Sequence, residues 1–128
     1  MSNTATYLVT NFQKGDFMAW TVCSQCLSCG TITLRDDNTT YFTAVKQSPS
    51  TDLQLILQGS NTYNGGPHLR VEVSLPSGYN VKQCILSSNI VDDVSNIVGY
   101  LYNYCIEDST DNDYNDYYVN LVAWHHKG

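Results

Sequence analysis

Apolar and polar residues alternate along much of the chain with the two-residue period of β-strands. The pattern is strictest at 69–75, where leucine and valine take every second position, and it recurs at 53–58 and 117–124. Such alternation gives each strand one face for a core and one face for solvent. Six further strands are predicted at residues 6–12, 17–23, 30–35, 39–45, 80–87 and 98–106.

Short stretches rich in glycine, proline, aspartate and asparagine separate these segments, which is typical of turns between antiparallel strands. About nine short strands joined in this way predict an all-β fold, an antiparallel β-sandwich with Greek-key-like connections. Residues 89–97 are predicted to form a short helical turn, and 58–67 an exposed loop. We find no internal repeat or long linker, so residues 1–128 are predicted to form a single domain.

The chain is acidic, with a formal net charge of −6 from 12 acidic side chains against 6 basic ones. A chain of this balance is not expected to bind nucleic acid, since contacts with phosphates need a basic surface. Five of the acidic residues fall within ten positions, which we call the acidic loop (residues 107–116): Glu107, Asp108, Asp111, Asp113 and Asp116. Such a block is usually a solvated tail, but here an aromatic, strand-like segment follows it.

The acidic loop has the donor chemistry of a calcium site. Calcium takes six to eight oxygen ligands, largely from carboxylates and carbonyls. Asp111, Asp113 and Asn115 are spaced two apart, so a curled loop can direct them toward one centre. The helix-loop-helix calcium motif does not fit, because Asp116 and Val122 stand where it needs Gly and Glu. A solvated acidic hairpin without a ligand is the simpler alternative.

The run EDSTDNDYND, followed by a strand with Trp124 and a final Gly128, resembles the LecB-like (PA-IIL-like) calcium-dependent bacterial fucose/mannose-binding lectins. The segments FMAWT, LRVEVSLPSG and QCIL are more loosely similar to strands of that family. The resemblance implies a carbohydrate-binding lectin in which two adjacent calcium ions coordinate hydroxyls of a fucose- or mannose-type monosaccharide. It implies no enzyme, and calcium-bound carboxylates would also lack the protonated acid that a glycosidase needs.

The resemblance also implies ligands, residue by residue. The implied metal ligands are Glu107, Asp111, Asp113, Asn115 and Asp116, with a main-chain oxygen at Ser24 and the carboxylate of Gly128 from a partner subunit. The implied sugar-binding residues are Asp108, Asp111, Asp116, Gln25, Cys26 and Gly128. A homodimer or tetramer follows, because one subunit completes the site of another. The alternative is a structural calcium-binding β-sandwich module that binds no sugar.

Two segments depart from the family pattern. The stretch from Asp116 to Gly128 is longer by about two residues, which predicts a bulge near 123–127. The segment 22–30 contains Cys23, Cys26 and Cys29. Three uses of these thiols remain open: a disulfide to Cys84 or Cys105, a metal–thiolate site, or free thiols.

The N-terminal residues lack a cationic start followed by an apolar run, and no apolar stretch has the length of a membrane span. These features predict synthesis in the cytoplasm without membrane insertion, with or without later unconventional export to the cell surface. His125 and His126 are expected to be an exposed pair rather than metal ligands, and Trp20 and Trp124 to serve in the core or an interface.

Overall fold

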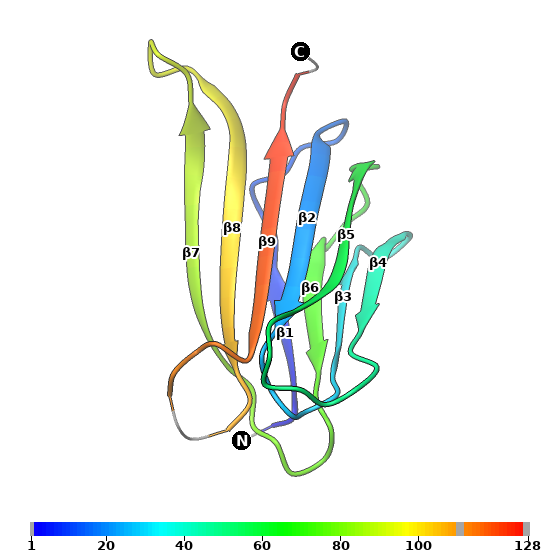
Figure 1. The fold of residues 1–128 in the computed structure, drawn as a ribbon. Helices are drawn as coiled ribbons and strands as arrows, with labels where there is room; N and C mark the ends of the chain where they lie inside the picture. The colour runs from blue at the N-terminus through cyan, green and yellow to red at the C-terminus, as the bar shows by residue number, and fades with distance from the viewer. Residues whose placement is uncertain (1, 110–111, 127–128) are drawn as a thin grey trace.

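Two antiparallel sheets face each other in the computed structural model, which describes residues 2–109 and 112–126 (Figure 1). Across these residues the chain forms nine strands. The four-stranded sheet has the order β1 (Thr4–Leu8), β6 (Arg70–Ser74), β3 (Thr31–Arg35), β4 (Thr40–Val45). The five-stranded sheet has the order β5 (Gln54–Thr62), β2 (Phe17–Ser24), β9 (Tyr117–Trp124), β8 (Ile97–Glu107), β7 (Lys82–Val91).

This arrangement confirms the predicted antiparallel β-sandwich. In the larger sheet β2 lies beside β9, the last strand of the β7–β8–β9 meander. The described residues include no helix with the length and hydropathy to cross a membrane.

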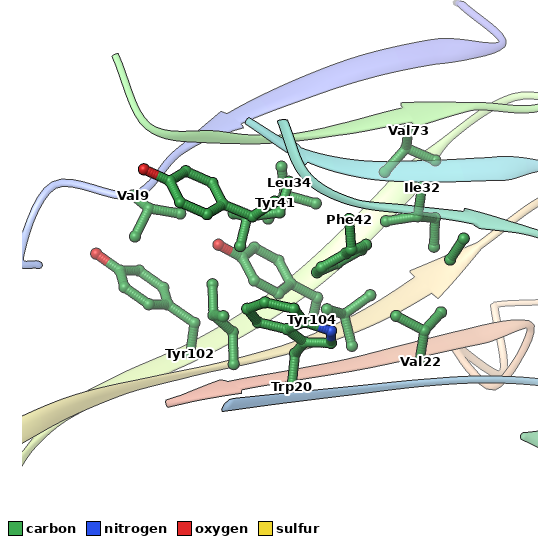
Figure 2. Packing of buried hydrophobic residues seen from close by; sticks show 14 of the residues in the cluster. Val9, Trp20, Val22, Ile32, Leu34, Tyr41, Phe42, Val73, Tyr102 and Tyr104 are labelled. Carbon is green, nitrogen blue, oxygen red and sulfur yellow. The ribbon is translucent and has the colours of Figure 1, made fainter. Parts of the chain in front are cut away.

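The core lies between the sheets and is made by the alternating apolar positions. In β9 every second residue is buried, beginning with Tyr117 and ending with Ala123. Trp20 packs on Phe42 of the opposite sheet with ring centroids 5.2 Å apart, and Tyr102 stacks on Tyr104 at 5.9 Å (Figure 2). Trp20 therefore belongs to the core, whereas Trp124 is exposed on the outer face.

The leucines at 53–57 do not share one face, which corrects the predicted pattern. In the pairing of β2 with β5, Val22 faces Leu57 but Cys23 faces Leu55, so Ile56 is an extra residue in a β-bulge. A bulge reverses the faces on its two sides. Leu57 therefore packs against the core, while Leu55 is 56% exposed. The strand also continues to Thr62, so the predicted loop 58–67 begins later.

Residues 89–97 do not form the predicted helical turn. Strand β7 runs to Val91 and β8 begins at Ile97, so only the tip of a long hairpin remains between them. The carboxylate of Asp92 accepts hydrogen bonds from the backbone N–H groups of Val94 and Asn96, at 3.0 and 2.9 Å. This local bonding closes the turn without a helix.

The last strand is regular up to its end. The registers of β9 with β2 and with β8 run without a shift to Trp124, so the bulge predicted near 123–127 is absent at residues 123 and 124. His125 Nδ1 then lies 2.9 Å from Asp16 Oδ1, and its backbone N–H donates to Val98. His125 therefore fastens the chain end to the turn before β2, as a structural residue.

A buried carboxylate organises the turn after β3. The backbone N–H groups of Asn38 and Thr39 donate to Asp36 Oδ1 at 2.7 Å, and the Tyr41 hydroxyl donates to Oδ2 at 2.9 Å. Burial acts to raise the pKa of Asp36, but these hydrogen bonds outweigh it and hold the pKa below the ordinary value. The ionised form of Asp36 therefore stabilises the fold.

We expect Asp36→Asn to lower the free energy of unfolding by about 2 kcal/mol at pH 7, because an amide replaces an acceptor of three hydrogen bonds. A group with a lowered pKa contributes stability above its unfolded pKa and loses it as pH falls through its folded pKa. The deficit of the variant should therefore shrink below about pH 4. Urea denaturation at pH 7 and in acid measures it, with exposed Asp52→Asn as control. An equal loss of stability at both pH values would contradict a stabilising role for the ionised form of Asp36.

Candidate functional site

The acidic loop joins β8 to β9 at one end of the sandwich (Figure 1). Glu107 is the last residue of β8, and Asp116 immediately precedes β9. The backbone N–H of Asp116 donates to Ile106 at 3.2 Å, which brings the two ends of the loop together. Between them, Asn112 and Tyr114 have left-handed backbone angles, with φ of 57° and 52°. Such residues curl the chain back toward its own start.

Carboxylates converge inside this curl. One ligand atom from each of Glu107, Asp113 and Asp116 lies within 4.8 Å of the other two. A second group, Cys26, Asp108 and Asp116, meets the same criterion, so Asp116 belongs to both. Three of these carboxylates are buried, with Glu107 0% exposed and Asp108 and Asp116 each 6% exposed. Such a set of buried oxygen donors fits a hard cation such as calcium.

The pKa of Asp116 reflects this crowding of carboxylates. Burial raises the pKa of Asp116, and the neighbouring Asp108 carboxyl adds to the rise. Hydrogen bonds from the Glu107 side chain and from the Asp108 backbone N–H, the latter 2.8 Å long, act in the opposite direction. The raised pKa of Asp116 thus reflects the cost of holding several carboxylates close together in a buried place.

Asn115 extends the donor set. One atom of its side-chain amide lies 2.7 and 2.9 Å from the two carboxylate oxygens of Asp113. With the nitrogen in that place, the amide donates two hydrogen bonds. With the oxygen in that place, three oxygens converge, which is a cation-binding arrangement. A rotation of one amide therefore converts Asn115 from a hydrogen-bond donor into a candidate ligand.

Residues 24–28, which we call the facing segment, lie against the acidic loop. Ser24 Oγ and the backbone N–H of Gln25 donate to the Asp116 carbonyl oxygen at 2.8 and 3.0 Å. Ser28 Oγ donates to Asp108 Oδ2 at 2.6 Å. The Tyr117 hydroxyl donates to the Ser28 carbonyl at 2.8 Å. These bonds hold the two segments together in a fixed relation.

The cysteines of this region do not gather. Burial alternates through the facing segment, so Cys26 is buried while Cys29 is exposed and Cys23 lies on the outer face of β2. A spacing of three residues in extended chain places neighbouring thiols on opposite faces. Neither candidate metal group among the described residues holds more than one thiol. The thiolate cluster considered from sequence therefore finds no support.

The disulfide considered from sequence is also not formed, and all five cysteines, each within the described residues, are free. In the larger sheet Tyr118 of β9 stands between Cys23 and Cys105. Two strand spacings are about 10 Å, beyond the reach of a disulfide.

A cavity of about 420 Å³ opens between the acidic loop and the facing segment. It is lined by Gln25, Cys26, Leu27, Thr51, Tyr79, Asp108, Ser109, Asp113, Asn115 and Asp116. This size is within the range of small-molecule sites. We call it the loop cavity.

The loop cavity brings together most of the residues that were singled out in the sequence. The predicted sugar-binding residues Gln25, Cys26, Asp108 and Asp116 line it, as do the predicted ligands Asp113 and Asn115. Glu107 adjoins it through its contacts with Asp113 and Asp116, whereas Ser24 is fully buried behind the lining. Asp111 and Gly128 lie outside the described residues.

Sequence reasoning missed Lys46, which directly follows β4 and is 2% exposed. Its Nζ donates to Ser24 Oγ at 2.8 Å, to the Ser50 carbonyl at 3.1 Å, and to the Cys26 carbonyl. An ammonium group has three donors, and here all three are used. Lys46 thus binds the facing segment to residues 46–50. A charged residue at a strand end gave no sign of this role.

We expect Lys46→Met to loosen the facing segment, because the buried Cys26 carbonyl and the part-buried Ser50 carbonyl lose a charged donor. The free energy of unfolding should fall by about 2 kcal/mol. Amide hydrogens of residues 25–28 should exchange faster, which hydrogen-exchange mass spectrometry measures. Exposed Lys14→Met is the matched control. Unchanged exchange in residues 25–28 would show that Lys46 does not organise this wall of the cavity.

Comparison with known proteins gives one family match. A family model described as fucose-binding lectin II (PA-IIL) matches residues 10–126. No curated protein sequence matches the chain.

Solved structures similar to the chain include three bacterial lectins. The Chromobacterium violaceum lectin CV2L, in complex with α-methyl-fucoside, has a TM-score of 0.62 at 19% identity, over 96% of each chain. The Ralstonia solanacearum high-affinity mannose-binding lectin has a TM-score of 0.62 at 22% identity, over 96% of each chain. The C-terminal domain of the Burkholderia cenocepacia lectin BC2L-C has a TM-score of 0.57 at 17% identity, over 100% of each. At these identities the likeness supports the fold.

Proposed function

This chain belongs to the fucose-binding lectin II (PA-IIL) family, and we propose that it binds a fucose- or mannose-type monosaccharide through two adjacent calcium ions in the acidic loop. Proteins of this family are lectins, which bind sugars without transforming them, so the chain is a carbohydrate-binding protein and not an enzyme. The proposal adds the metal, the number of ions and the residues that hold them.

The observation that carries the proposal is the shared position of Asp116. Its carboxyl group converges with those of Glu107 and Asp113 beside a cavity of monosaccharide size, and the Asn115 amide lies against Asp113 in the same loop. Two neighbouring divalent ions need a carboxylate common to both, since the ligand also screens their mutual repulsion. Glu107 and Asp113 would join Asp116 at one ion, and Asn115 would join Asp113 and Asp116 at the other.

The remaining cavity residues have roles toward the sugar. When bound, calcium supplies open coordination positions that neutral hydroxyl oxygens can fill. Asp108 already accepts a hydrogen bond from Ser28, which fixes its carboxylate to accept further bonds from sugar hydroxyls. A thiol is a soft ligand and suits calcium poorly, so Cys26 would contact the sugar instead of the metal. Gln25 lies beside it on the rim.

We also propose a homodimer, which could pair further into a tetramer. Strand β9 starts at the acidic loop and extends about 27 Å to the opposite end of the sandwich (Figure 1). His125, near the far end, is fastened to Asp16. The carboxylate of Gly128 would therefore complete the site of a second copy, related by a two-fold axis that reverses the strand direction.

The outer face of the five-stranded sheet suits such a partner. A shallow hollow there has no charged residue in its lining: Ala19, Trp20, Thr21, Leu101, Tyr102, Asn103, Asn120, Leu121 and Val122. Trp124 lies beside this hollow with 43% of its surface exposed. An uncharged face with an exposed tryptophan favours contact with a second chain.

Isothermal titration with fucose, mannose and galactose, in calcium and again in excess chelator, tests the proposed function. We expect heat of binding with fucose or mannose when calcium is present, and no heat in excess chelator. The second candidate is a structural calcium module, favoured by the deep burial of Glu107 and Asp116. Calcium binding without heat from any sugar, and without calcium-dependent retention on glycan resin, would support that module and contradict the lectin.

A further inference from the structure

Two of the free cysteines stand directly opposite each other in the larger sheet. Cys84 of β7 pairs with Cys105 of β8 in the antiparallel register. Opposed residues of antiparallel strands have Cα atoms about 4.5 to 5.5 Å apart and side chains on the same face. A disulfide needs Cα atoms about 4.4 to 6.8 Å apart. The register alone therefore brings these thiols within bonding reach.

The pair is also accessible to reagents. Cys84 is exposed and Cys105 partly buried, and both line an open hollow with Tyr118 and with Asp113 and Tyr114 of the acidic loop. Strand β7 is the edge of its sheet, pairs with β8 alone, and has mostly exposed residues, so it packs little against the core. A disulfide would therefore stabilise β7 at a place where packing contributes little to its stability.

The position of the pair connects it to the acidic loop. Cys105 precedes Glu107 by two residues, and Lys82 of β7 pairs with Glu107 in the same register. Lys82 Nζ also donates to Asn112 Oδ1 of the loop at 3.0 Å. Movement of β7 relative to β8 therefore moves a contact of the loop and the strand that positions Glu107.

We propose that Cys84 and Cys105 are a thiol–disulfide switch, and that the disulfide tightens calcium binding by holding β7 in place beneath the acidic loop. The coupling to calcium rests on the proposed function, whereas the disulfide rests on the register alone. The oxidant is a low-molecular-weight disulfide. The Cys84 thiolate attacks it, forming a mixed disulfide and releasing one thiolate. The Cys105 thiolate then attacks the Cys84 sulfur and releases the second. Two protein thiols thus lose two protons and two electrons, which the reagent carries away as two small thiols.

The test begins with the native protein incubated with oxidised glutathione, followed by alkylation and peptide mapping. Chymotrypsin is required, because no lysine or arginine lies between Cys84 and Cys105. We expect a Cys84–Cys105 cross-link that is lost in Cys84→Ser and in Cys105→Ser but kept in Cys29→Ser. Cross-links only at other cysteines, or mixed disulfides that never close, would overturn the proposal.

Calcium titration of the reduced and oxidised proteins then tests the coupling. We expect the Kd for calcium to be lower by a factor of about three after oxidation, the size of one modest loop-ordering term. The difference should persist in Cys29→Ser and vanish in both pair variants. Equal Kd values in the two redox states would overturn the coupling alone. Absence of calcium binding in both states would overturn it together with the proposed function, while the cross-link map would still stand.

Discussion

Asp116→Asn is expected to abolish calcium binding at both proposed sites while leaving the calcium-free protein folded. Asp116 is the buried carboxylate proposed as a ligand of both ions, so one substitution removes a ligand from each. The loss of affinity should exceed about 100-fold, above the range found when only an outer partner of a ligand is removed. Isothermal titration with calcium measures it, and titration with fucose or mannose should give no heat.

Without calcium, the same variant is expected to be more stable than the parent protein. Because the folded-state pKa of Asp116 is raised, the calcium-free protein should lose stability as pH rises through that pKa. Asparagine keeps the shape without the charge, so the variant in chelator should unfold at a higher temperature than the parent protein at pH 7. Exposed Asp93→Asn is the matched control and should change neither quantity. Normal calcium binding by Asp116→Asn would refute the two-ion site.

A short extension after Gly128 should weaken sugar binding by about tenfold or more, equivalent to about 1.4 kcal/mol. The physical reason is that the terminal carboxylate, proposed as a ligand in the site of the partner, becomes a peptide bond and loses its charge. Titration of the calcium-loaded protein measures the effect, with the same extension placed at the N-terminus as control.

Sedimentation separates the two ways in which the extended protein could fail. A dimer that persists with weakened sugar binding indicates loss of the carboxylate ligand, and a monomer indicates loss of the interface itself. Full affinity in the extended dimer would remove Gly128 from the set of ligands and leave the acidic loop to hold the ions alone.

The sandwich itself could be predicted from alternation, because burial on one face is a local property of each strand. Residues 69–75 and 117–124 show this, since every second residue, from Leu69 to Leu75 and from Tyr117 to Ala123, is buried. The prediction failed at Leu55 because one extra residue in β5 reverses the faces, and a bulge depends on the neighbouring strand. It failed at 89–97 because side-chain bonding by Asp92 closes the hairpin, which hydrophobic periodicity does not report.

The candidate site could likewise be predicted only in part. The carboxylates of 107–116 could be found in the sequence, because they are close together in the chain and their chemistry is specific. Lys46 could not, since its partners Ser24 and Cys26 are brought to it only by the packing of β2 and β4. The pairing of Cys84 with Cys105 likewise depends on the β7–β8 register. Contacts between distant segments carry no local pattern.

The way Lys46 holds the facing segment has a consequence for how related proteins can diverge. Its acceptors are the Ser24 hydroxyl and two main-chain carbonyls, so none depends on the side chains at 25 or 27. Those two side chains line the loop cavity, while the carboxylates on the other side belong to another segment. Mutations at Gln25 and Leu27 can therefore accumulate without removing a proposed cation ligand or a contact of Lys46. Sugar preference can change over evolution at little cost to the ability to bind sugar at all.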